Sequence, residues 1–487
     1  MKRRRLLQYA AALPILPYID RPGSAWAAPP STTSRVRPGD PRWPKAPEWE
    51  SLRQSVAGNL ITLQSPLDAC RATPGGEACR DLFRELKNPY FIGDSPALTQ
   101  TCGWVGAWTA QPSVYVVAAR KAAHVAAAVN FAREKNLRLV IRGGGHSYLG
   151  ASNAPDSLMI WTRAMDSVTV DDAFVAQGCA AVQAPQPAVT VGAGAIWMHV
   201  YDAVSTRAGR YVQGGGCGTV GVAGLVQGGG FGTYSKQFGT AGSALLEAEM
   251  DGAVRIANTC SEPELFWALK GGGGGSFGVV TSLTLRTHDL PATFGAVSTS
   301  IRATSDAACR RLLGRFIAFY AEALFNPHWG ELATLRPDNR LQISMNFQGL
   351  DKIEATALWQ PFLEWVTAQD DLVMTPPSII AGPGRYRWDG AFLETHAPGA
   401  VLRDDRPGAP AANFFWSGNL AEAGHVIHGF NSLWIPAALL RPAQQAVLAD
   451  TLMAASRYWG VEMHFQKGLA GAPEEVLAAA ASSGARR

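Results

Sequence analysis

The sequence RGGGHSYLG, from Arg142 to Gly150, and the sequence GGGCGTVGVAGLVQGGGFG, from Gly214 to Gly232, carry most of the functional information in this chain. Each is dense in glycine and holds one nucleophile, His146 in the first and Cys217 in the second. Glycine has no side chain, so another group can approach its backbone closely. We therefore expect a ligand to lie against both loops, beside an imidazole and a thiol.

Length and composition indicate a globular protein with several structural units. The 487 residues exceed a single ordinary core, so we expect two or three units. Of these residues, 47% are hydrophobic and 17% are charged, which supplies ample core material. The net charge of +4 is weak, and no basic patch interleaved with aromatic residues follows the N-terminus. Nucleic acid is therefore not expected as a partner.

The N-terminal sequence MKRRRLLQYAAALPILPYI is typical of an export signal. A basic start precedes a short apolar stretch, and the sequence AWA at 25–27 fits a cleavage site. The arginine pair at 3–4 fits a twin-arginine signal, with an ordinary secretory signal as the alternative. The stretch is too short, and too interrupted by proline, to span a membrane. We predict a signal peptide over 1–28, a linker over 29–45, and a periplasmic or secreted protein.

The cysteine count also bears on the environment of the protein. There are seven cysteines, so at least one thiol stays unpaired if the others form disulfides. Cys70 and Cys79 flank a TPGGE turn, which favours a local disulfide in an oxidising compartment. The sequence does not pair the others, and Cys217 is the one we expect to stay out of disulfides.

From Ser113 onward the pattern predicts a β-α-β unit that ends at the His146 loop. The sequence SVYVVAA is strand-like, a helix follows over residues 120–136, and LRLVIR predicts the second strand. The residues that share the apolar face of this helix are Ala122, Val125, Val129 and Ala132. In the second glycine-dense stretch, we expect Thr219 to cap a short helix that runs through Val222 and Leu225.

After about residue 291 the pattern changes to longer alternating strands and amphipathic helices. One predicted hairpin turns at residues 337–339. Its second strand alternates between a polar face, with Gln342, Ser344, Asn346 and Gln348, and an apolar face, with Ile343, Met345 and Phe347.

Neither glycine-dense stretch matches a standard phosphate-binding motif. No Gly-Lys-Ser/Thr follows the glycines, which excludes a P-loop. No G-x-G-x-x-G opens a helix with an acid about 20 residues later, so a Rossmann fingerprint is a poor fit. Both stretches nevertheless follow strands and offer many free N–H groups. These features favour a phosphate-bearing cofactor held by loops.

Three segments in order resemble the FAD-linked oxidases of the berberine-bridge-enzyme type, in the vanillyl-alcohol-oxidase-like flavoprotein superfamily. RGGGHSYLG is similar to the family's histidine loop, and residues 214–243 are similar to its cysteine loop and following glycine helix. The sequence PELFWALKGGGGGSFGVVTSLTLRTH, residues 263–288, resembles the segment that closes its flavin domain. The resemblance covers about residues 100 to 290, with looser similarity beyond.

This resemblance implies an α+β fold with two domains. A PCMH-type FAD-binding domain would span residues 46–290, and a substrate domain with an antiparallel sheet backed by helices would span 291–487. It also implies FAD held by two covalent bonds, from His146 to the 8-methyl carbon and from Cys217 to C6 of the ring. Donors at a helix N-terminus are expected to lower the pKa of the Cys217 thiol. Two bonds would fix the ring and make it more oxidising.

The resemblance further implies non-covalent contacts with FAD. They are Arg142, Gly143, Gly144, Gly145, Ser147, Val220, Gly221, Val222, Gly224, Gly228, Gly242 and Val280. A purely structural role is the alternative for any single glycine. In this family a small side chain three positions after the cysteine leaves room for dioxygen near the flavin. Val220 therefore favours an oxidase that makes hydrogen peroxide, with ordinary packing as the alternative.

The sequence departs from the family pattern in three places. Gly218 stands where proline is usual, and about ten extra residues, CAAVQAPQPA, lie between the two loops. The end of the chain, APEEVLAAAASSGARR, has nothing like the family's closing segment, and the tyrosine base found there in some members is not identifiable. We interpret the chain as either truncated or a shortened homologue.

Oxidation of an alcohol carbon needs a base that takes the hydroxyl proton as hydride leaves. The sequence VEMHFQK predicts a strand that carries Glu462, His464 and Gln466 on one face, which makes them candidates for acid-base chemistry and substrate binding. A solvated face is the alternative. Candidates for a sugar-binding or aromatic platform, or alternatively for core packing, are Tyr386, Trp388 and Trp416.

The sequence thus predicts an exported FAD-dependent oxidoreductase. It would transfer hydride from an alcohol, sugar or secondary-metabolite carbon to covalently bound FAD, with oxygen as the acceptor. A dehydrogenase with another acceptor and a catalytically inactive flavin-binding homologue are the alternatives. We expect a small-molecule substrate, no metal site and no membrane span, and leave the oligomeric state open.

Overall fold

The His146 loop extends from the edge of a small sheet in the computed structural model, which describes residues 34–250 and 255–482. Strands β4 (Tyr115–Ala118), β6 (Ser157–Trp161) and β5 (Arg138–Arg142) pair in parallel, and β1 (Leu60–Thr62) adds an antiparallel edge. Helix α6 (Ala122–Glu134) connects β4 to β5 and buries Val125 and Ala132. The predicted β-α-β unit is confirmed, and the loop begins where β5 ends.

A five-stranded antiparallel sheet supports the second glycine-dense loop. Its order is β11–β10–β12–β8–β7. These strands are β7 (Val168–Phe174), β8 (Gln186–Gly192), β10 (Leu245–Met250), β11 (Arg255–Asn258) and β12 (Val280–Arg286). Helix α7 (Trp197–Tyr201), its continuation η1 (Asp202–Arg207) and α8 (Val222–Gln227) share a buried core with this sheet. The sequence IWMHVYDAVSTRAG, residues 196–209, predicts a helix that ends at Gly209, and Gly209, with φ of +68°, follows η1.

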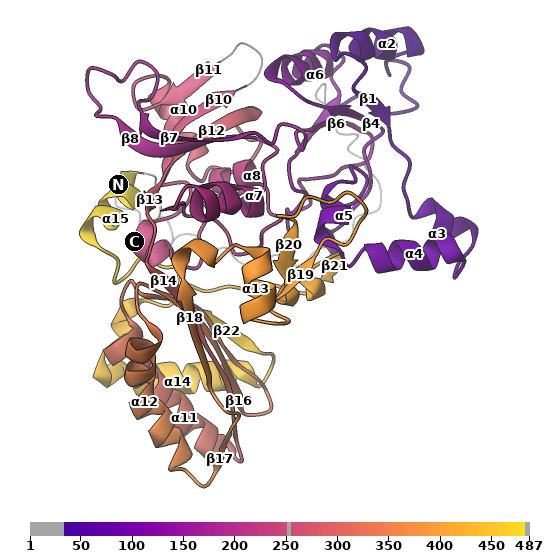
Figure 1. Ribbon diagram of the computed structural model, residues 1–487. Helices are drawn as coiled ribbons and strands as arrows, with labels where there is room; N and C mark the ends of the chain where they lie inside the picture. Colours follow the sequence, from indigo (N-terminus) through magenta and orange to yellow (C-terminus); the bar gives the residue numbers. More distant parts are fainter. Residues whose placement is uncertain (1–33, 251–254, 483–487) are drawn as a thin grey trace, which may run out of the picture. The chain divides into compact units, whose positions relative to one another are not determined.

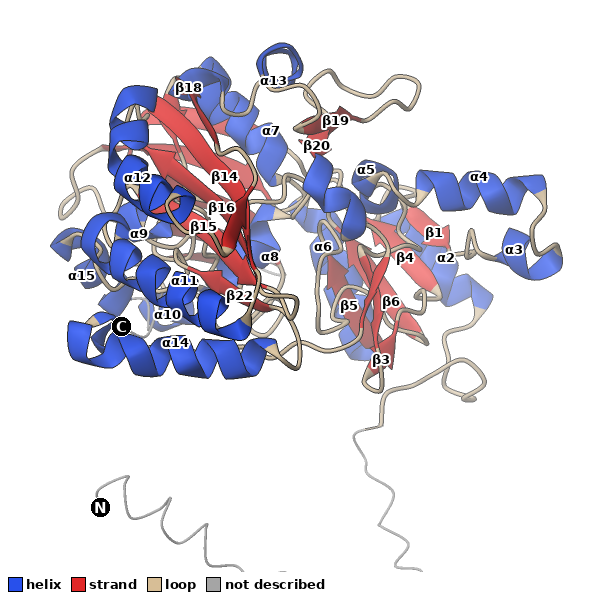
Figure 2. Cartoon of the chain, turned by 90° about the horizontal axis from the view of Figure 1, so that it is seen from below, coloured by secondary structure: helices blue, strands red, loops and turns tan. Residues whose placement is uncertain are grey.

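The chain after residue 291 forms an antiparallel sheet backed by helices, as predicted. Its order is β17–β14–β16–β15–β22, and β18 also pairs with β14. These strands are β14 (Thr293–Ala303), β15 (Trp329–Leu335), β16 (Arg340–Gln348), β17 (Leu372–Met374), β18 (Ser378–Pro383) and β22 (Val461–His464). Figures 1 and 2 show α11 (Asp306–Phe319), α12 (Lys352–Thr367) and α14 (Pro442–Ser456) against one face of the sheet.

The face of this sheet that lies away from the helices is polar. In β16, Ile343 and Met345 are buried against the helices, whereas Gln342 and Ser344 are not. The predicted alternation is confirmed from Gln342 to Phe347, whereas Gln348 is buried and does not belong to the open polar face.

Part of this second region returns to the first. Trp388 and Phe414 belong to the same buried cluster as the residues of α7 and α8. Strand β21 (His425–Ile427) pairs in parallel with β2 (Thr101–Trp104). The Trp416 indole N–H donates to the Gly216 carbonyl at 3.1 Å. This return brings residues 416–425 next to the loop that holds Cys217.

Shorter elements complete the described chain. Helix α2 (Ala46–Ser55) buries Trp49 and Leu52, as their spacing predicts. The remaining elements are α3 (Asp68–Ala72), α4 (Glu77–Glu85), α5 (Pro89–Gly93), β3 (Trp108–Thr109), β9 (Arg210–Tyr211), α9 (Ser235–Phe238), α10 (Pro263–Leu269), β13 (His288–Asp289), η2 (Tyr320–Leu324), η3 (Gly384–Tyr386), α13 (Gly390–His396), β19 (Val401–Arg403), β20 (Phe414–Trp416), η4 (Ser417–Ala421), η5 (Ala437–Leu440) and α15 (Glu474–Ser482). The predicted signal peptide lies outside the described residues.

All the cysteines lie within the described ranges. Cys70 pairs with Cys79, as predicted, and Cys179 pairs with Cys260. The second bond ties the start of the extra segment CAAVQAPQPA to the turn after β11. Cys217 is a free thiol, as expected, and so are Cys102 and Cys309.

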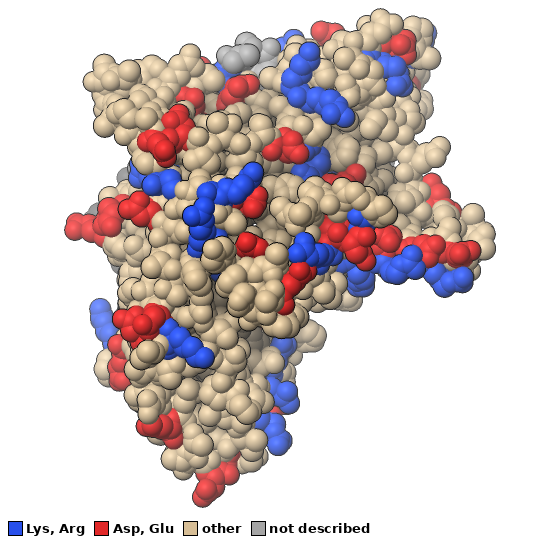
Figure 3. Space-filling view, viewed as in Figure 1, with Lys and Arg blue, Asp and Glu red and all other residues tan. Residues whose placement is uncertain are grey.

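The charged side chains on one face and the apolar character of the helices are two further features of the chain. On the face drawn in Figure 3, the two charge signs are interspersed and neither forms a continuous field. Across residues 34–250 and 255–482, no helix has both the length and the apolar character to cross a bilayer.

Candidate functional site

The two glycine-dense loops meet backbone to backbone at Gly144 and Gly221. A Cβ added to Gly144 would lie 2.6 Å from the Gly221 nitrogen and 2.8 Å from the Thr219 carbonyl oxygen. A Cβ added to Gly221 would lie 2.8 Å from the Gly144 nitrogen. Backbone atoms cannot move aside as the end of a side chain can. The contact between the loops therefore requires glycine at both positions.

His146 connects the two loops through its side chain. Its Nε2 lies 3.1 Å from Thr219 Oγ1. Burial, followed by the positive charge of Arg142, lowers the pKa of His146 to about 3. The imidazole is therefore neutral in neutral and mildly acidic solution. Because Nε2 is engaged, Nδ1 is the nitrogen left for another partner.

Thr219 corrects one prediction. It does not cap α8, because the N-cap of that helix is Gly221, which has no side chain to cap with. The Thr219 hydroxyl is used on His146 instead. The cap was predicted from local sequence, whereas the observed partner lies 73 positions earlier in the chain.

Arg142 anchors the His146 loop from below. Its guanidinium is buried and donates to the carbonyls of Pro96 at 2.9 Å and Ile92 at 3.1 Å. Burial lowers the pKa of Arg142 to about 9. Gly145 covers this side chain with φ of +76°, and a Cβ there would lie 2.9 Å from Arg142 Nε. The guanidinium thus binds protein carbonyls and orders the loop.

Cys217 lies in an acidic rather than a basic environment. Its thiol donates to Glu422 Oε2 at 3.3 Å, and the Asn419 amide donates to its Sγ at 3.2 Å. Burial, followed by the Glu422 charge, raises the pKa of the Cys217 thiol well above its ordinary value. The expectation that helix N-terminal donors lower this pKa is wrong. The nearest strong influence is a carboxylate from a distant segment, and it favours the protonated thiol.

Tyr148 and His425 complete the cluster around these two loops. Their ring centroids lie 6.0 Å apart, and His425 Nε2 lies 3.2 Å from Thr101 Oγ1. Burial, followed by the charge of Glu422, raises the pKa of Tyr148 to about 12. Tyr148 follows His146 closely in the loop, so a single turn of chain presents both rings.

Several residues expected at the cofactor are held by contacts with protein. Val222 and Val280 are buried in the core, and Val220 packs against the same cluster. Gly228 is the C-cap of α8. A Cβ at Gly242 would lie 3.0 Å from a backbone carbonyl oxygen. Glycine at 242 is therefore explained by packing.

Two further residues expected at the cofactor, Gly143 and Ser147, lie in the His146 loop. Ser147 Oγ accepts a hydrogen bond from Ala151 N at 3.2 Å within its own loop. A Cβ at Gly143 would lie 3.3 Å from the Ala193 carbonyl oxygen, a tight contact with the turn after β8. These contacts fix the course of the first loop.

Two glycines lie beside open space instead. A Cβ at Gly216 or at Gly224 would meet no atom within 4 Å. No protein contact requires glycine at either position. Gly216 directly precedes Cys217, so there is open space next to the thiol, whereas Gly224 lies within α8.

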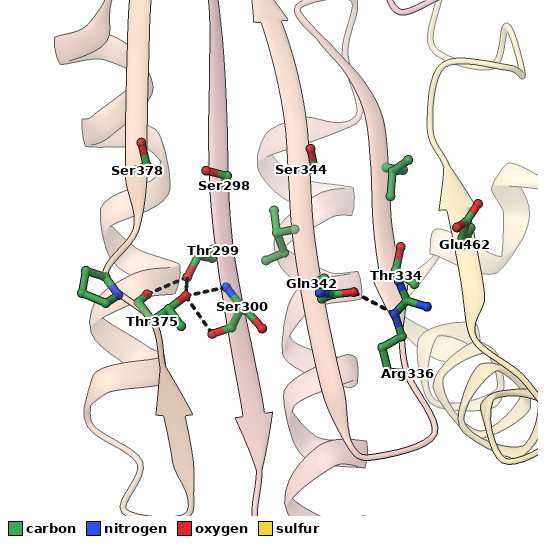
Figure 4. Close-up of a pocket in the computed structure, with 13 residues that line it drawn as sticks. Ser298, Thr299, Ser300, Thr334, Arg336, Gln342, Ser344, Thr375, Ser378 and Glu462 are labelled. Carbon is green, nitrogen blue, oxygen red and sulfur yellow. Dashed lines mark hydrogen bonds between the residues drawn. The ribbon is translucent and has the colours of Figure 1, made fainter. Parts of the chain in front are cut away.

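The polar face of the antiparallel sheet β17–β14–β16–β15–β22, here called the third sheet, forms a cavity of about 490 Å³. One row across four strands runs through Ser300, Gln342, Thr334 and Glu462. Figure 4 shows these side chains together with Ser298 and Ser344, which line the same cavity. Such a surface offers hydroxyl, amide and carboxylate groups for hydrogen bonds to a polar substrate.

The three catalytic candidates lie at the edge strand of this sheet. Glu462 lines the cavity, and His464 Nε2 lies 3.5 Å from Glu462 Oε2. The hydrogen bond from His464 is the main cause that lowers the pKa of Glu462. Gln466 is buried, and its amide donates to Glu331 Oε2 at 3.5 Å. The strand β22 ends at His464, so Gln466 continues beyond it.

Glu331 connects this edge to Thr233, which follows the glycine-dense stretch that holds Cys217. It accepts a hydrogen bond from the Thr233 hydroxyl, and it adopts φ of +68°, which is uncommon for a residue with a side chain. Its charge also contributes to the raised pKa of Cys217. The candidates on β22 and the Cys217 loop therefore border the same region.

The aromatic platform of Tyr386, Trp388 and Trp416 is not present as such. Trp388 is buried and stacks on Tyr201 with centroids 4.5 Å apart. Trp416 holds Gly216 through its indole N–H, and Tyr386 stacks on Phe392 at 4.8 Å. The core alternative is correct for Trp388, because its ring is enclosed by protein.

Three residues of the cluster escaped sequence reasoning. Asn419, Glu422 and Glu331 occur in segments without a motif, and only the return of residues 416–425 to the first region brings the first two into place. A lone carboxylate in a loop carries no sequence signal of its own. For Thr219 the signal was present, since it lies two positions after Cys217.

Comparisons with known proteins agree with this geometry. Residues 112–251 match the FAD binding domain family. The FAD-linked oxidoreductase malF of Malbranchea aurantiaca is 37% identical over 289 residues, which cover 54% of this chain and 48% of that protein. The VAO-type flavoprotein oxidase VAO615 of Thermothelomyces thermophilus is 30% identical over 433 residues, covering 79% and 72%. The chain spans about half the length of the first curated relatives it matches.

Solved structures extend the likeness to the fold. MtVAO615, a VAO-type flavoprotein from Myceliophthora thermophila C1, superposes with a TM-score of 0.69 at 26% identity, covering 87% of this chain and 75% of that one. The glucooligosaccharide oxidase of Acremonium strictum has a TM-score of 0.51 at 18% identity, covering 72% and 63%. That oxidase carries a 6-S-cysteinyl, 8α-N1-histidyl FAD.

The matched domain and the relatives together define a class of protein, the flavoproteins with a PCMH-type FAD-binding domain. Within that class, the chain belongs to the VAO-type flavoproteins, and its relatives include FAD-linked oxidoreductases. The predicted α+β fold is confirmed with it. The site fits FAD on its own terms, because the joined loops hold a neutral imidazole and a free thiol, with open space at Gly216 next to that thiol.

Proposed function

We propose that the protein is an exported oxidase that transfers hydride from an alcohol, sugar or secondary-metabolite carbon to FAD, with dioxygen as the acceptor. FAD would be held by bonds from His146 and Cys217. The observation that supports this most directly is the junction at Gly144 and Gly221, with His146 hydrogen-bonded to the loop that holds Cys217. The 6-S-cysteinyl, 8α-N1-histidyl FAD of the Acremonium strictum oxidase is a precedent for such a pair on this fold.

The two side chains would form their bonds in a balanced oxidation. Each bond replaces one hydrogen of the side chain and one hydrogen of the ring. Both hydrogens and their electrons leave with dioxygen as hydrogen peroxide. His146 suits this role because its imidazole is neutral and Nδ1 is not engaged by Thr219.

The glycines and the neighbouring backbone would hold the rest of the cofactor. The N–H groups of the His146 loop follow β5 and offer donors to a pyrophosphate. Open space at Gly216 would leave room for the ring next to Cys217. Bound FAD would supply a two-electron acceptor next to the substrate. In domain terms, residues 46–290 would bind FAD and residues 291–487 would bind substrate.

The cavity on the third sheet would bind the substrate, and a carboxylate in its lining would accept the substrate's proton. Its serine, threonine and glutamine side chains match a hydroxylated molecule. Glu462 Oε would accept the proton of the substrate hydroxyl, and His464 would hold that carboxylate in place. The lowered pKa of Glu462 keeps it in the accepting, ionised form.

Val220 bears on the use of dioxygen as the electron acceptor, and the disulfides bear on the cellular compartment of the protein. Val220 is a modest side chain three positions after Cys217, which favours access of dioxygen. The bonds Cys70–Cys79 and Cys179–Cys260 suit an oxidising compartment outside the cytosol, which supports export.

Peroxide production tests this proposal. The purified protein, incubated in air with a panel of oligosaccharides and primary or benzylic alcohols, is expected to consume oxygen and release one hydrogen peroxide per substrate oxidised. Reduction of a dye acceptor without peroxide would mean a dehydrogenase. A flavin that no member of the panel bleaches, with or without air, would contradict the enzymatic proposal.

The pH profile tests the role of Glu462. Glu462→Gln is expected to lower kcat by about a hundredfold or more, because the proton acceptor is lost. Since the folded-state pKa is lowered, activity should persist as pH falls and decline only below the ordinary value of 4.5. His464→Ala removes the main cause of that shift and should move the acid limb to higher pH. Unchanged kcat in Glu462→Gln would exclude it as the base.

A further inference from the structure

Cys217 faces a chemical difficulty that His146 does not. Its thiol is protonated over the neutral range, because burial and the Glu422 charge both oppose the thiolate. A protonated thiol is a poor nucleophile. Bond formation at Cys217 therefore needs a group that removes the proton as the sulfur reacts.

Glu422 stands in the position to do so. The Cys217 thiol donates directly to Glu422 Oε2 at 3.3 Å, and Asn419 donates to Sγ at 3.2 Å. Asn419 Nδ2 also lies 3.5 Å from Glu422 Oε2. One amide thus orients both the sulfur and the carboxylate. The arrangement is the nucleophile, base and orienting group of an activated side chain.

The segment that carries this pair is fixed to the site on both sides. Before it, the Trp416 indole N–H binds the Gly216 carbonyl at 3.1 Å. After it, Ala423 is buried with Ile92 and Leu98, and β21 pairs with β2. Glu422 is therefore held beside Cys217 by packing and by strand pairing, although its own side chain is exposed.

We propose that Glu422 is the proton acceptor, and Asn419 the positioning residue, through which Cys217 forms its bond to FAD. This rests on the proposed function. The S–H bond breaks and its proton passes to Glu422 Oε2, while the sulfur electron pair forms the S–C bond. The ring carbon loses its hydrogen as a proton. The electron pair that this releases reduces dioxygen, which takes up the two protons and leaves as hydrogen peroxide.

Other ionisable groups border the pair and belong in any account of its pH response. Tyr148 interacts electrostatically with both Glu422 and Cys217, His425 interacts with Glu422, and Glu331 and Tyr201 interact with Cys217. Among them Tyr148 has a pKa raised to about 12, so it stays neutral over the range used below.

Peptide mass spectrometry of the holoprotein tests the proposal. The protein, its Glu422→Gln and Asn419→Ala variants, and Glu322→Gln as an exposed carboxylate control are incubated in air from pH 6 to pH 9.5. The fraction of residues 211–236 that carries flavin is followed with time. At pH 7, Glu422→Gln should form the Cys217 bond about a hundredfold more slowly. Asn419→Ala should be about fivefold slower, and both should keep the His146 bond.

The pH profile separates proton transfer from simple structure. In Glu422→Gln the rate should recover as pH rises, because the thiolate then forms without a base. Wild-type rates in Glu422→Gln at pH 7 would overturn the proposal, and so would an equal loss at every pH. A wild-type protein with flavin on His146 but none on Cys217 would overturn the bicovalent proposal itself. Thermal melting of each variant shows whether it is folded, and Glu422→Asp serves as a second variant.

Discussion

The His146 loop and the Cys217 loop hold the same kind of group by different means. His146 is ordered by residues close to it in the fold of one region, with Arg142 beneath the loop and Thr219 on Nε2. Its pKa of about 3 leaves a neutral imidazole that needs no further activation. Cys217 depends on Asn419 and Glu422, about 200 residues later, and its raised pKa keeps the thiol protonated.

This difference teaches where each reactive group gets its chemistry. A neutral imidazole is already a nucleophile, so burial alone prepares it. A thiol is made less reactive by burial, so it needs a base. The first loop can therefore be completed by contacts within the first region, whereas the second depends on the return of the chain from the other region.

The largest expected effect comes from breaking the contact that the loops share. In Gly144→Ala, the new Cβ would lie 2.6 Å from the Gly221 nitrogen. We expect a loss of about 1–3 kcal/mol in the free energy of unfolding. Both covalent bonds should fail together, as read from flavin fluorescence on a denaturing gel. Gly314→Ala in α11, where a Cβ meets nothing within 4 Å, is the control. Retention of both bonds in Gly144→Ala would refute the shared junction.

A smaller effect should separate the loops. Thr219→Val removes the hydroxyl from His146 Nε2 and keeps the side-chain volume. Loss of one hydrogen bond worth about 1 kcal/mol should slow formation of the His146 bond about fivefold. The Cys217 bond should form as before, and Thr219→Ser should keep the His146 bond at the wild-type rate. The fraction of each flavinylated peptide measures this, and equal slowing at the two sites would contradict the separation.

The smallest effect is expected on the Cys217 side alone. Trp416→Phe removes the indole N–H that binds the Gly216 carbonyl. The ring is kept, so the loss should be below about 1 kcal/mol and the Cys217 bond should form about twofold more slowly. The His146 bond should not change. If Trp416→Phe instead slows formation of the His146 bond, residues 416–425 order both loops, and the two loops are not held by different means.

Much of the fold could be predicted because its signals are local. The β-α-β unit before His146, the end of the α7–η1 helix at Gly209, and the alternation in β16 follow from periodicity and glycine placement. The disulfide Cys70–Cys79 followed from a short turn. The partner of Cys179 did not, because Cys260 lies 81 residues away.

The site was predictable in its reactive groups and not in their environment. His146 and Cys217 stand out as lone nucleophiles among glycines. The role of Thr219, the raised pKa of Cys217 and the burial of Trp388 each depend on contacts between distant segments. Contacts between distant segments produce no recognisable spacing of residues in the sequence. Local reasoning therefore gave the wrong sign for the thiol pKa.

The most direct test of the central claim is the mass of the flavin-bearing tryptic peptides. The account predicts one species in which a single FAD joins residues 143–163, which contain His146, to residues 211–236, which contain Cys217. Cys217→Ala should leave FAD on the first peptide alone, and His146→Ala should remove the joined species. Two unmodified peptides from a folded, flavin-bearing protein, or a flavin on any other residue, would contradict it.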